Sequence, residues 1–428
     1  MRKFLPVYVL LLTIFFSCSP KINKVVSVGE VERIERALSS DEMRGRKAFT
    51  ANADRAAEFI SAEFKKIGLE QFWGATDYKQ TFTMTTPKVV STSATFNGKI
   101  IDAKNVVVFT STPKLEVTEQ SGFRKVAIKT GSNFFVEARK YIQAKENVLV
   151  IVDTSFAANF NRLPSAKSFL FQSDNSAIFV LTDVDPTIYS VTAEHEINIS
   201  TATNVVGILP GKSKKDKYVI FSGHYDHLGI GKAVNGDSIY NGANDDAAGI
   251  TAVITLAKYF KAYKNNECTL IFVAFTAEEI GGYGSQYFSK QLEADKVIAM
   301  FNIEMIGTES KWGKNSAYIT GYDLTDMGQI LGKNLKGTDF TFYPDPYIQQ
   351  NLFYRSDNAT LARLGVPAHT ISTSKMDDEP NYHKVSDELE TLDIKNMTEI
   401  IKAIVLSSKT IVNGKDTPSR VKVAGLTR

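Results

Sequence analysis

The second half of the chain alternates short apolar runs with amphipathic segments, and this pattern constrains the fold more than any other feature of the sequence. Five apolar runs of strand length stand in order: 218–222, 269–275, 297–303, 317–320 and 366–372. In the segment 249–263, apolar residues recur every three or four positions, which is typical of a helix packed on a sheet. This alternation predicts an α/β fold with a mainly parallel (mixed) central sheet flanked by helices.

Polar clusters follow or adjoin these runs where the strands are expected to end. The residues that carry chemistry in these clusters are His224, Asp226, Asp245, Asp246, Glu278, Glu279, Glu304 and His383. Ligands of open α/β sheets bind beyond the carboxyl ends of the strands, so these side chains are expected at one edge. Imidazole and carboxylate groups without a thiolate suit zinc, with manganese or cobalt as alternatives.

Each cluster alone has an ordinary structural explanation. A histidine at a strand end is commonly a surface residue, and an Asp-Asp pair before a helix commonly caps the helix. The order of four clusters, each beside a buried strand, favours a shared site instead. Acids crowded at one place repel each other unless a cation lies between them, which is the physical reason to expect a metal.

Five motifs in this order resemble the two-zinc exopeptidase family of bacterial secreted aminopeptidases. The fold is shared by glutamate carboxypeptidase, glutaminyl cyclase and the transferrin receptor ectodomain. The motifs are GHYDHLG, GANDDAAG, FTAEEIGGYGS, NIEMIG and YHKVSDE, and the earlier LSSDEMRGRKAF also resembles the family. The resemblance spans about 30–85 and 203–412. It implies the zinc exopeptidase fold and a peptide substrate.

The resemblance also implies residue roles. Two Zn²⁺ ions per chain would be held by five ligands: His224, Asp245, Glu279, Glu304 and His383. Asp245 resembles the carboxylate that bridges the two metals. Glu278 resembles the general base and Tyr382 the hydroxyl donor to the oxyanion. Asp226 resembles the acid that hydrogen-bonds the metal-binding histidine two residues before it and fixes its tautomer.

Two further residues of these motifs receive other interpretations, and one of the five expected ligands departs from the family pattern. Asp246 faces away from the metals and is expected to be structural. His227 has no ligand role in the family pattern and is expected only to line the site. Glu304 stands where most members have Asp. Its longer side chain binds the metal of His224, binds the free amine of the substrate, or has no role, and we expect the first.

The N-terminus is expected to be a targeting segment. Residues 1–17 combine a basic head with a 13-residue apolar run and read as a signal peptide. The run is too short to span a bilayer. Cys18 follows a small residue, as at the lipidation site of bacterial lipoproteins, so a lipid anchor in a membrane of the cell envelope is expected. The alternative is an ordinary signal peptide that contains a cysteine.

The domain organisation follows from these assignments. Residues 18–27 are expected to link the anchor to a zinc peptidase domain formed by 28–84 and 203–414. The segment 85–202 lacks the regular strand–helix alternation of the second half of the chain. It is expected to be a smaller inserted α+β domain that resembles a protease-associated domain. The 428 residues carry 50 Lys+Arg and 47 Asp+Glu, a difference of 50 − 47 = +3 without a basic block, which argues against nucleic-acid binding.

The resulting expectation is a zinc-dependent exopeptidase, an aminopeptidase acting on peptides in the bacterial cell envelope. Three alternatives remain open at this point. The first is a carboxypeptidase or dipeptidase specificity. The second is a glutaminyl cyclase, a transferase on the same fold with a single zinc. The third is a binding ectodomain that retains the fold without catalysis, which is disfavoured because no expected ligand is missing.

Overall fold

The computed structural model describes residues 22–167, 169–264 and 266–423. The expected signal peptide, Cys18 and the start of the expected linker therefore lie outside the described residues. Within the described ranges, no helix combines the length and the apolar character that a membrane span requires.

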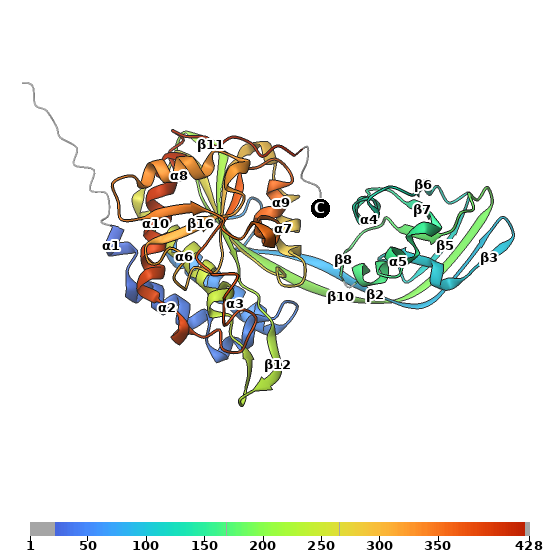
Figure 1. Cartoon of the computed structure of the whole chain (residues 1–428), viewed down its shortest axis with the longest axis horizontal. Helices are drawn as coiled ribbons and strands as arrows, with labels where there is room; N and C mark the ends of the chain where they lie inside the picture. The colour runs from blue at the N-terminus through green and yellow to red at the C-terminus, as the bar shows by residue number, and fades with distance from the viewer. Residues whose placement is uncertain (1–21, 168, 265, 424–428) are drawn as a thin grey trace, which may run out of the picture.

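A mixed sheet forms the centre of the larger unit (Figure 1). Its strand order is β17-β16-β18-β15-β11-β14-β10-β2-β3, and the short strands β1, β5 and β8 pair at its margins. Strands β14, β11, β15 and β18 run parallel to one another, whereas β10 is antiparallel to β14. The bounds of this sheet are β1 Glu70–Gln71, β2 Lys79–Phe96, β3 Lys99–Ile101, β5 Lys114–Thr118, β8 Leu170–Phe171, β10 Tyr189–Leu209, β11 Lys214–His224, β14 Cys268–Phe275, β15 Val297–Ile303, β16 Ser316–Ile319, β17 Thr341–Pro344 and β18 Ala368–Ser372.

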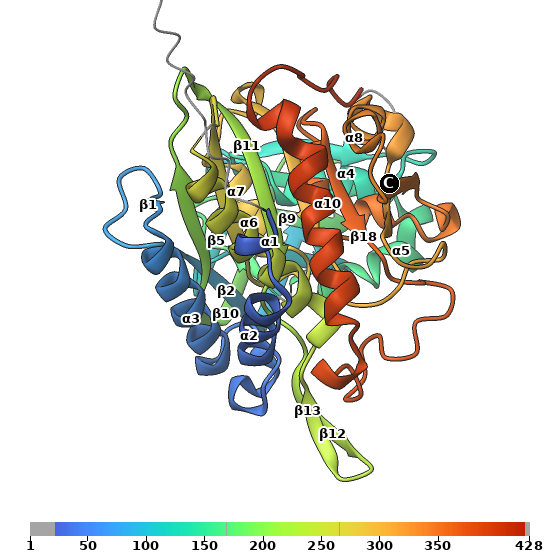
Figure 2. The ribbon, with the colours of Figure 1, turned by 90° about the vertical axis from the view of Figure 1, so that its left-hand side faces the viewer.

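Helices cover both faces of this sheet because its central strands are apolar on both sides. Alternate residues of a strand enter different cores: Phe221 packs in the larger one and Ile220 in the smaller. The larger core is covered by α2, α3, α6, α8 and α10, of which α2, α3 and α10 face the viewer in Figure 2. The bounds of the helices are α1 Ile22–Val25, α2 Val28–Leu38, α3 Ala51–Ile67, α4 Phe134–Ile142, α5 Ala157–Phe160, α6 Ala248–Tyr263, α7 Tyr283–Ser289, α8 Met327–Leu335, α9 Asn358–Ala362 and α10 Ile394–Val412. The predicted α/β architecture is confirmed.

Local signals in the sequence set the ends of these helices. The side chain of Thr50 accepts a hydrogen bond from the backbone N–H of Asn52 and caps α3, which ends at Gly68 in the left-handed conformation (φ 79°). The side chain of Asp393 caps α10 in the same way. Helix α6 is buried along most of its length. Its N-terminus therefore holds the preceding Asp-Asp segment in a fixed place against the sheet.

Strands β2 and β10 continue far beyond the central sheet as a two-stranded arm (Figure 1). The arm carries a second, four-stranded sheet of order β4-β9-β7-β6 with its own apolar core. Its bounds are β4 Val106–Phe109, β6 Arg124–Ile128, β7 Val148–Val152 and β9 Ala177–Leu181. This α+β unit lies inside the segment 85–202. A further hairpin, β12 Gly229–Val234 and β13 Asp237–Tyr240, projects from the larger unit near the strand ends.

Candidate active site

Several of the predicted polar residues lie at one edge of the sheet, at the carboxyl ends of three neighbouring parallel strands, β14, β11 and β15. His224 is the last residue of β11, and Glu304 directly follows β15. Glu278 and Glu279 follow β14 after a two-residue turn, in which Ala277 has a left-handed φ of 58°. Because parallel strands end on the same side, these side chains meet at that edge, as predicted.

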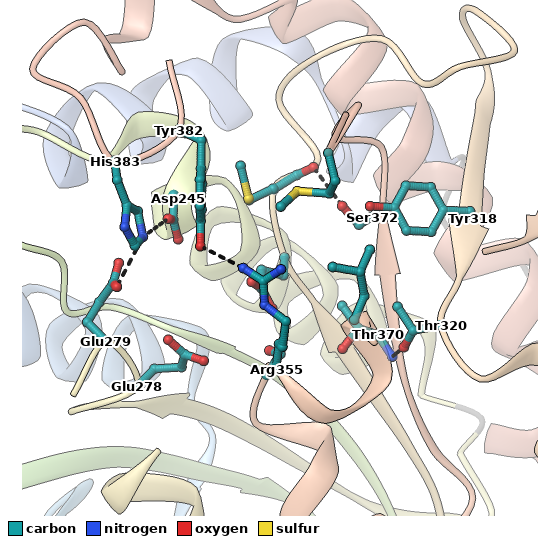
Figure 3. A pocket seen from close by; sticks show the side chains of 15 residues that line it. Asp245, Glu278, Glu279, Tyr318, Thr320, Arg355, Thr370, Ser372, Tyr382 and His383 are labelled. Atoms are coloured by element: carbon teal, nitrogen blue, oxygen red, sulfur yellow. Dashed lines mark hydrogen bonds and ion pairs between the residues drawn. The ribbon is translucent and has the colours of Figure 1, made fainter. Parts of the chain in front are cut away.

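Asp245 lies at the centre of the cluster and faces two groups of ligand atoms. Its Oδ1 is 3.3 Å from Nε2 of His224, and its Oδ2 is 3.2 Å from Nε2 of His383. The same nitrogen of His383 is 3.2 Å from Oε2 of Glu279. Figure 3 shows His383 between the carboxylates of Asp245 and Glu279. Each oxygen of Asp245 therefore belongs to a different group.

Both groups have the composition and spacing of a metal site. His224, Asp245 and Glu304 bring their ligand atoms within 4.8 Å of one another, and so do His227, Asp245 and Glu279. The glutamate at position 304, one methylene longer than the family's aspartate, still reaches the group of His224. Imidazole nitrogen and carboxylate oxygen are the donor set that zinc takes in catalytic sites.

The buried charges of the cluster fit a divalent cation. Burial raises the pKa of Asp226 to about 7 and that of Glu304 to about 7, and it raises the pKa of Glu278 well above its usual value. Nε2 of His224 and Oε2 of Glu304 are buried without a hydrogen-bond partner among the described residues. Unpaired buried donors and acceptors are costly, so these atoms match the metal ligands that the sequence predicts.

The Asp245 carboxyl behaves differently from the other acids. Burial opposes its ionisation, but the close imidazoles of His224 and His383 outweigh burial and hold the pKa of Asp245 below its usual range. In turn, Asp245 and Glu279 raise the pKa of His383 to about 10. The cluster thus favours an ionised carboxylate at its centre, which a bridging ligand requires.

Glu278 occupies a separate place beside the ligands. It belongs to neither ligand group, and it lines the pocket next to Asp245 and Glu304. Its backbone N–H donates to Oδ1 of Asp226 at 3.1 Å, which fixes the turn that carries it. Figure 3 shows its carboxylate pointing into the pocket, away from the backbone of the adjacent Glu279. Glu278 thus faces the pocket without belonging to a ligand group.

Tyr382 and Arg355 also line the pocket. The ring of Tyr382 stacks on that of His383, with ring centroids 4.0 Å apart. Nη2 of Arg355 donates to the hydroxyl of Tyr382 at 3.5 Å, and Arg355 has no carboxylate within ion-pair distance among the described residues (Figure 3). The hydroxyl and the guanidinium therefore offer donors to one region of the pocket. Sequence reasoning did not find Arg355, which no motif marks.

Asp226 holds His224 differently from what we expected. Nδ1 of His224 bonds to the backbone carbonyl of Asp226 at 3.1 Å, whereas the Asp226 carboxylate is 3.9 Å from that nitrogen. The carboxylate instead accepts the backbone N–H of Glu278. The tautomer of His224 is thus fixed by the main chain, and the Asp226 side chain positions the base-bearing turn.

Asp246 is structural, as predicted. Its Oδ2 accepts the backbone N–H of His224 at 3.1 Å. Its Oδ1 accepts the backbone N–H groups of Gly249 at 2.9 Å and Met305 at 3.1 Å. One buried carboxylate therefore ties together the end of β11, the start of α6 and the segment after Glu304.

Arg46 is a second support that sequence reasoning missed. This buried guanidinium donates to the carbonyl oxygens of Tyr225 at 2.6 Å, Leu38 at 2.7 Å, Asn241 at 2.5 Å and Gly242 at 2.8 Å. It joins the loop after β11 to the loop that leads into the Asp-Asp segment. The residue lies in the quoted EMRGR motif, but only its long-range contacts reveal this role.

Two groups of ligands that share one carboxylate at the strand ends of an α/β sheet define a candidate two-metal centre. Residues 204–407 match the model of Peptidase family M28. This match bears out the resemblance to two-zinc exopeptidases over that segment.

Solved structures of similar fold include aminopeptidases. The aminopeptidase from Aneurinibacillus sp. strain AM-1 superposes with a TM-score of 0.53 at 18% identity, covering 95% of this chain and 97% of that one. A zinc aminopeptidase from Bacillus subtilis gives 0.54 at 15% identity, covering 92% and 98%. At such identities the likeness shows the fold alone.

Curated relatives match over shorter segments. A probable zinc metalloprotease of Pyrenophora teres f. teres is 36% identical over 114 residues, which cover 26% of this chain and 23% of that protein. Aminopeptidase YwaD of Bacillus subtilis is 30% identical over 120 residues, covering 27% and 24%. The matches thus span about a quarter of the length of these relatives.

Proposed function

We propose that this protein is a zinc-dependent aminopeptidase that holds two zinc ions and removes N-terminal residues from peptides. The observation that carries the proposal is Asp245, whose two carboxylate oxygens face two different ligand groups. A shared carboxylate between two metals is typical of two-metal aminopeptidase sites. His224 and Glu304 would hold one zinc, and Glu279 and His383 the other.

The chain's own residues have distinct tasks in this reaction. When bound, the zinc ions lower the pKa of water and polarise the scissile carbonyl. The Glu278 carboxylate lies in the pocket as the proton acceptor for that water, and it later passes the proton to the leaving amine. Tyr382 Oη, with Arg355 beside it, offers a donor to the negative charge that develops on the carbonyl oxygen.

The aminopeptidase specificity is tested with matched substrates. An aminoacyl-anilide with a free amine should be hydrolysed by the zinc-loaded protein, and its N-acetylated form should not. A free amine is cationic, and the excess of acidic groups that line the pocket favours a cation over an uncharged N-acetyl group. Equal hydrolysis of both substrates would contradict the proposal.

A carboxypeptidase or dipeptidase is the second candidate, and Arg355 is the observation that favours it. This exposed guanidinium lines the pocket and can bind a substrate carboxylate with paired N–H donors. A peptide with a free C-terminus, compared with its C-terminal amide, separates the two candidates. Preference for the free acid with no need for a free amine would establish the carboxypeptidase.

We further propose that the protein is anchored to a membrane of the bacterial cell envelope through lipid on Cys18. The support is the basic head, the apolar run and the Ser17-Cys18 step of the sequence. Cys18→Ser should release the protein into the soluble envelope fraction or leave an unprocessed precursor. Parental protein that is soluble and lacks acyl mass at its N-terminus would contradict this.

A further inference from the structure

His227 is a buried histidine of the cluster for which the family pattern provides no role. It lies in the loop after β11, three residues beyond His224. Its Nδ1 is 2.7 Å from Oε1 of Glu279 and 3.9 Å from Oδ2 of Asp245. Its Nε2 is buried without a hydrogen-bond partner among the described residues.

Interatomic distances distinguish His383, which has the spacing of a metal ligand, from His227, which has the spacing of a hydrogen-bond donor. Ligand atoms about 2.0–2.1 Å from a tetrahedral zinc lie about 3.3 Å from one another. Nε2 of His383 meets this value, because it is 3.2 Å from both Oδ2 of Asp245 and Oε2 of Glu279. The His227 contact is shorter, has the length of a charge-assisted hydrogen bond, and reaches the other oxygen of Glu279.

We propose that His227 is a positioning residue for the second metal: its Nδ1–H donates to Oε1 of Glu279 and thereby presents Oε2 to the ion held with His383 and Asp245. This inference rests on the proposed two-metal site and adds a residue to it. Nδ1 is the ring nitrogen with an acceptor within reach, so a proton on Nδ1 is the one that makes this hydrogen bond.

The surroundings of His227 hold the ring in this orientation. Its backbone N–H donates to the carbonyl oxygen of Arg46 at 3.4 Å. Gly242 packs against the ring so closely that a Cβ at that position would lie 2.5 Å from Cγ of His227. The Arg46 guanidinium in turn binds the carbonyl oxygen of Gly242. The donor is therefore fixed before any metal binds, as a support for a ligating carboxylate should be.

Two variants at position 227 test whether His227 positions Glu279 or binds the metal itself. His227→Leu removes the donor, whereas His227→Asn places an amide N–H close to the position of Nδ1. Loss of a group that orients a ligand typically costs 10–100-fold in metal affinity. We expect His227→Leu to weaken one of two zinc sites by about that factor and His227→Asn to restore most of it. The measurement is competition with a chromophoric chelator, which yields both dissociation constants without a substrate.

Cobalt replaces zinc as a spectroscopic probe of the ligand set. We expect the d–d absorption of the Co²⁺-loaded His227→Asn variant to match that of the parent, because no ligand changes. A weaker or shifted spectrum would identify His227 as a direct ligand and overturn the positioning role. Unchanged zinc affinities in His227→Leu would also overturn it.

Controls separate this inference from folding and from the proposed function. His195→Asn changes a buried histidine of β10, on the arm, and should leave both zinc affinities at the parental value. Thermal unfolding of chelator-treated variants checks that the fold persists, and His227→Asn alone suffices if His227→Leu does not fold. Two normal zinc affinities without peptide hydrolysis would refute the aminopeptidase and leave the role of His227 standing.

Discussion

Oδ2 of Asp387 accepts a hydrogen bond from the backbone N–H of Asp245 at 3.0 Å, while its other oxygen accepts that of Asn244 at 2.8 Å. The carboxylate thus fixes the main chain at the residue whose side chain faces both ligand groups. Asp387 is buried four residues after His383, so one loop carries both a proposed ligand and the support of the Asp245 backbone.

Replacing Asp387 should lower both the stability of the protein and its zinc content. Asp387→Asn replaces one acceptor by an N–H group that faces another N–H, and an unsatisfied buried donor costs about 1–3 kcal/mol. We expect a lower free energy of unfolding and fewer zinc ions per chain, measured by denaturant titration and elemental analysis. The control is Asp378→Asn in an exposed part of the preceding loop, which should match the parent.

The adjacent glutamates should give opposite phenotypes. Glu278→Gln keeps the shape and removes the proton acceptor, so kcat should fall at least ~10²-fold, within the usual range of about 10²–10⁴ for general bases. Zinc content should stay parental. Glu279→Gln should instead lose zinc, because Glu279 lies in a ligand group. Exchanged phenotypes in parallel metal and kinetic assays would reverse the two assignments.

Gly249 should not tolerate a side chain. A Cβ there would lie 2.3 Å from Oδ2 of Asp246 and 2.2 Å from the carbonyl oxygen of Ile303. Since both neighbours are buried, Gly249→Ala should displace Asp246, lower stability by about 1–3 kcal/mol and reduce zinc binding. Gly332→Ala in α8 meets no atom within 4 Å and should be neutral or stabilising. Equal melting temperatures for the two variants would refute this packing account.

Glu35, which is not one of the proposed metal ligands, should make the stability of the protein depend on pH. Burial raises its pKa from 4.5 to about 8, although Thr251 donates to it and Arg46 lies near; Asp387 acts in the same direction as burial. Because the folded pKa exceeds the unfolded one, this contribution to stability is fully present below pH 4.5 and is lost as pH rises through 8. One pKa unit corresponds to about 1.4 kcal/mol.

Glu35→Gln should abolish that dependence. With chelator present, the variant should gain stability relative to the parent between pH 5 and pH 9, as judged by denaturant unfolding at both values. A difference between variant and parent that stays constant with pH would show that Glu35 does not titrate in this range.

Local sequence patterns were enough to predict the α/β fold and to place several candidate ligands at one edge of the sheet. Strand-length apolar runs followed by polar clusters predicted the positions of His224, Glu279 and Glu304, because parallel strands place their ends side by side. Asp246 could be assigned as structural, since the family resemblance separated it from Asp245. These predictions needed no knowledge of long-range contacts.

The supports of the site could not be predicted in the same way. Arg46 donates to carbonyl groups more than 170 residues away in the sequence. The residues next to Arg46 do not indicate which groups its guanidinium binds. His227 was expected only to line the site, because its contact with Glu279 depends on how two loops meet. The Asp226 carboxylate accepts the backbone N–H of Glu278 at 3.1 Å and lies 3.9 Å from Nδ1 of His224. Sequence spacing does not distinguish between these two partners.

The central claim is a two-zinc aminopeptidase, and a zinc titration of chelator-treated protein followed by aminoacyl-anilide hydrolysis tests it most directly. The account predicts that activity reaches its maximum at two zinc equivalents per chain and that the N-acetylated substrate is not hydrolysed at any zinc level. Saturation at one equivalent, or hydrolysis of the acetylated substrate at the same rate, would contradict it.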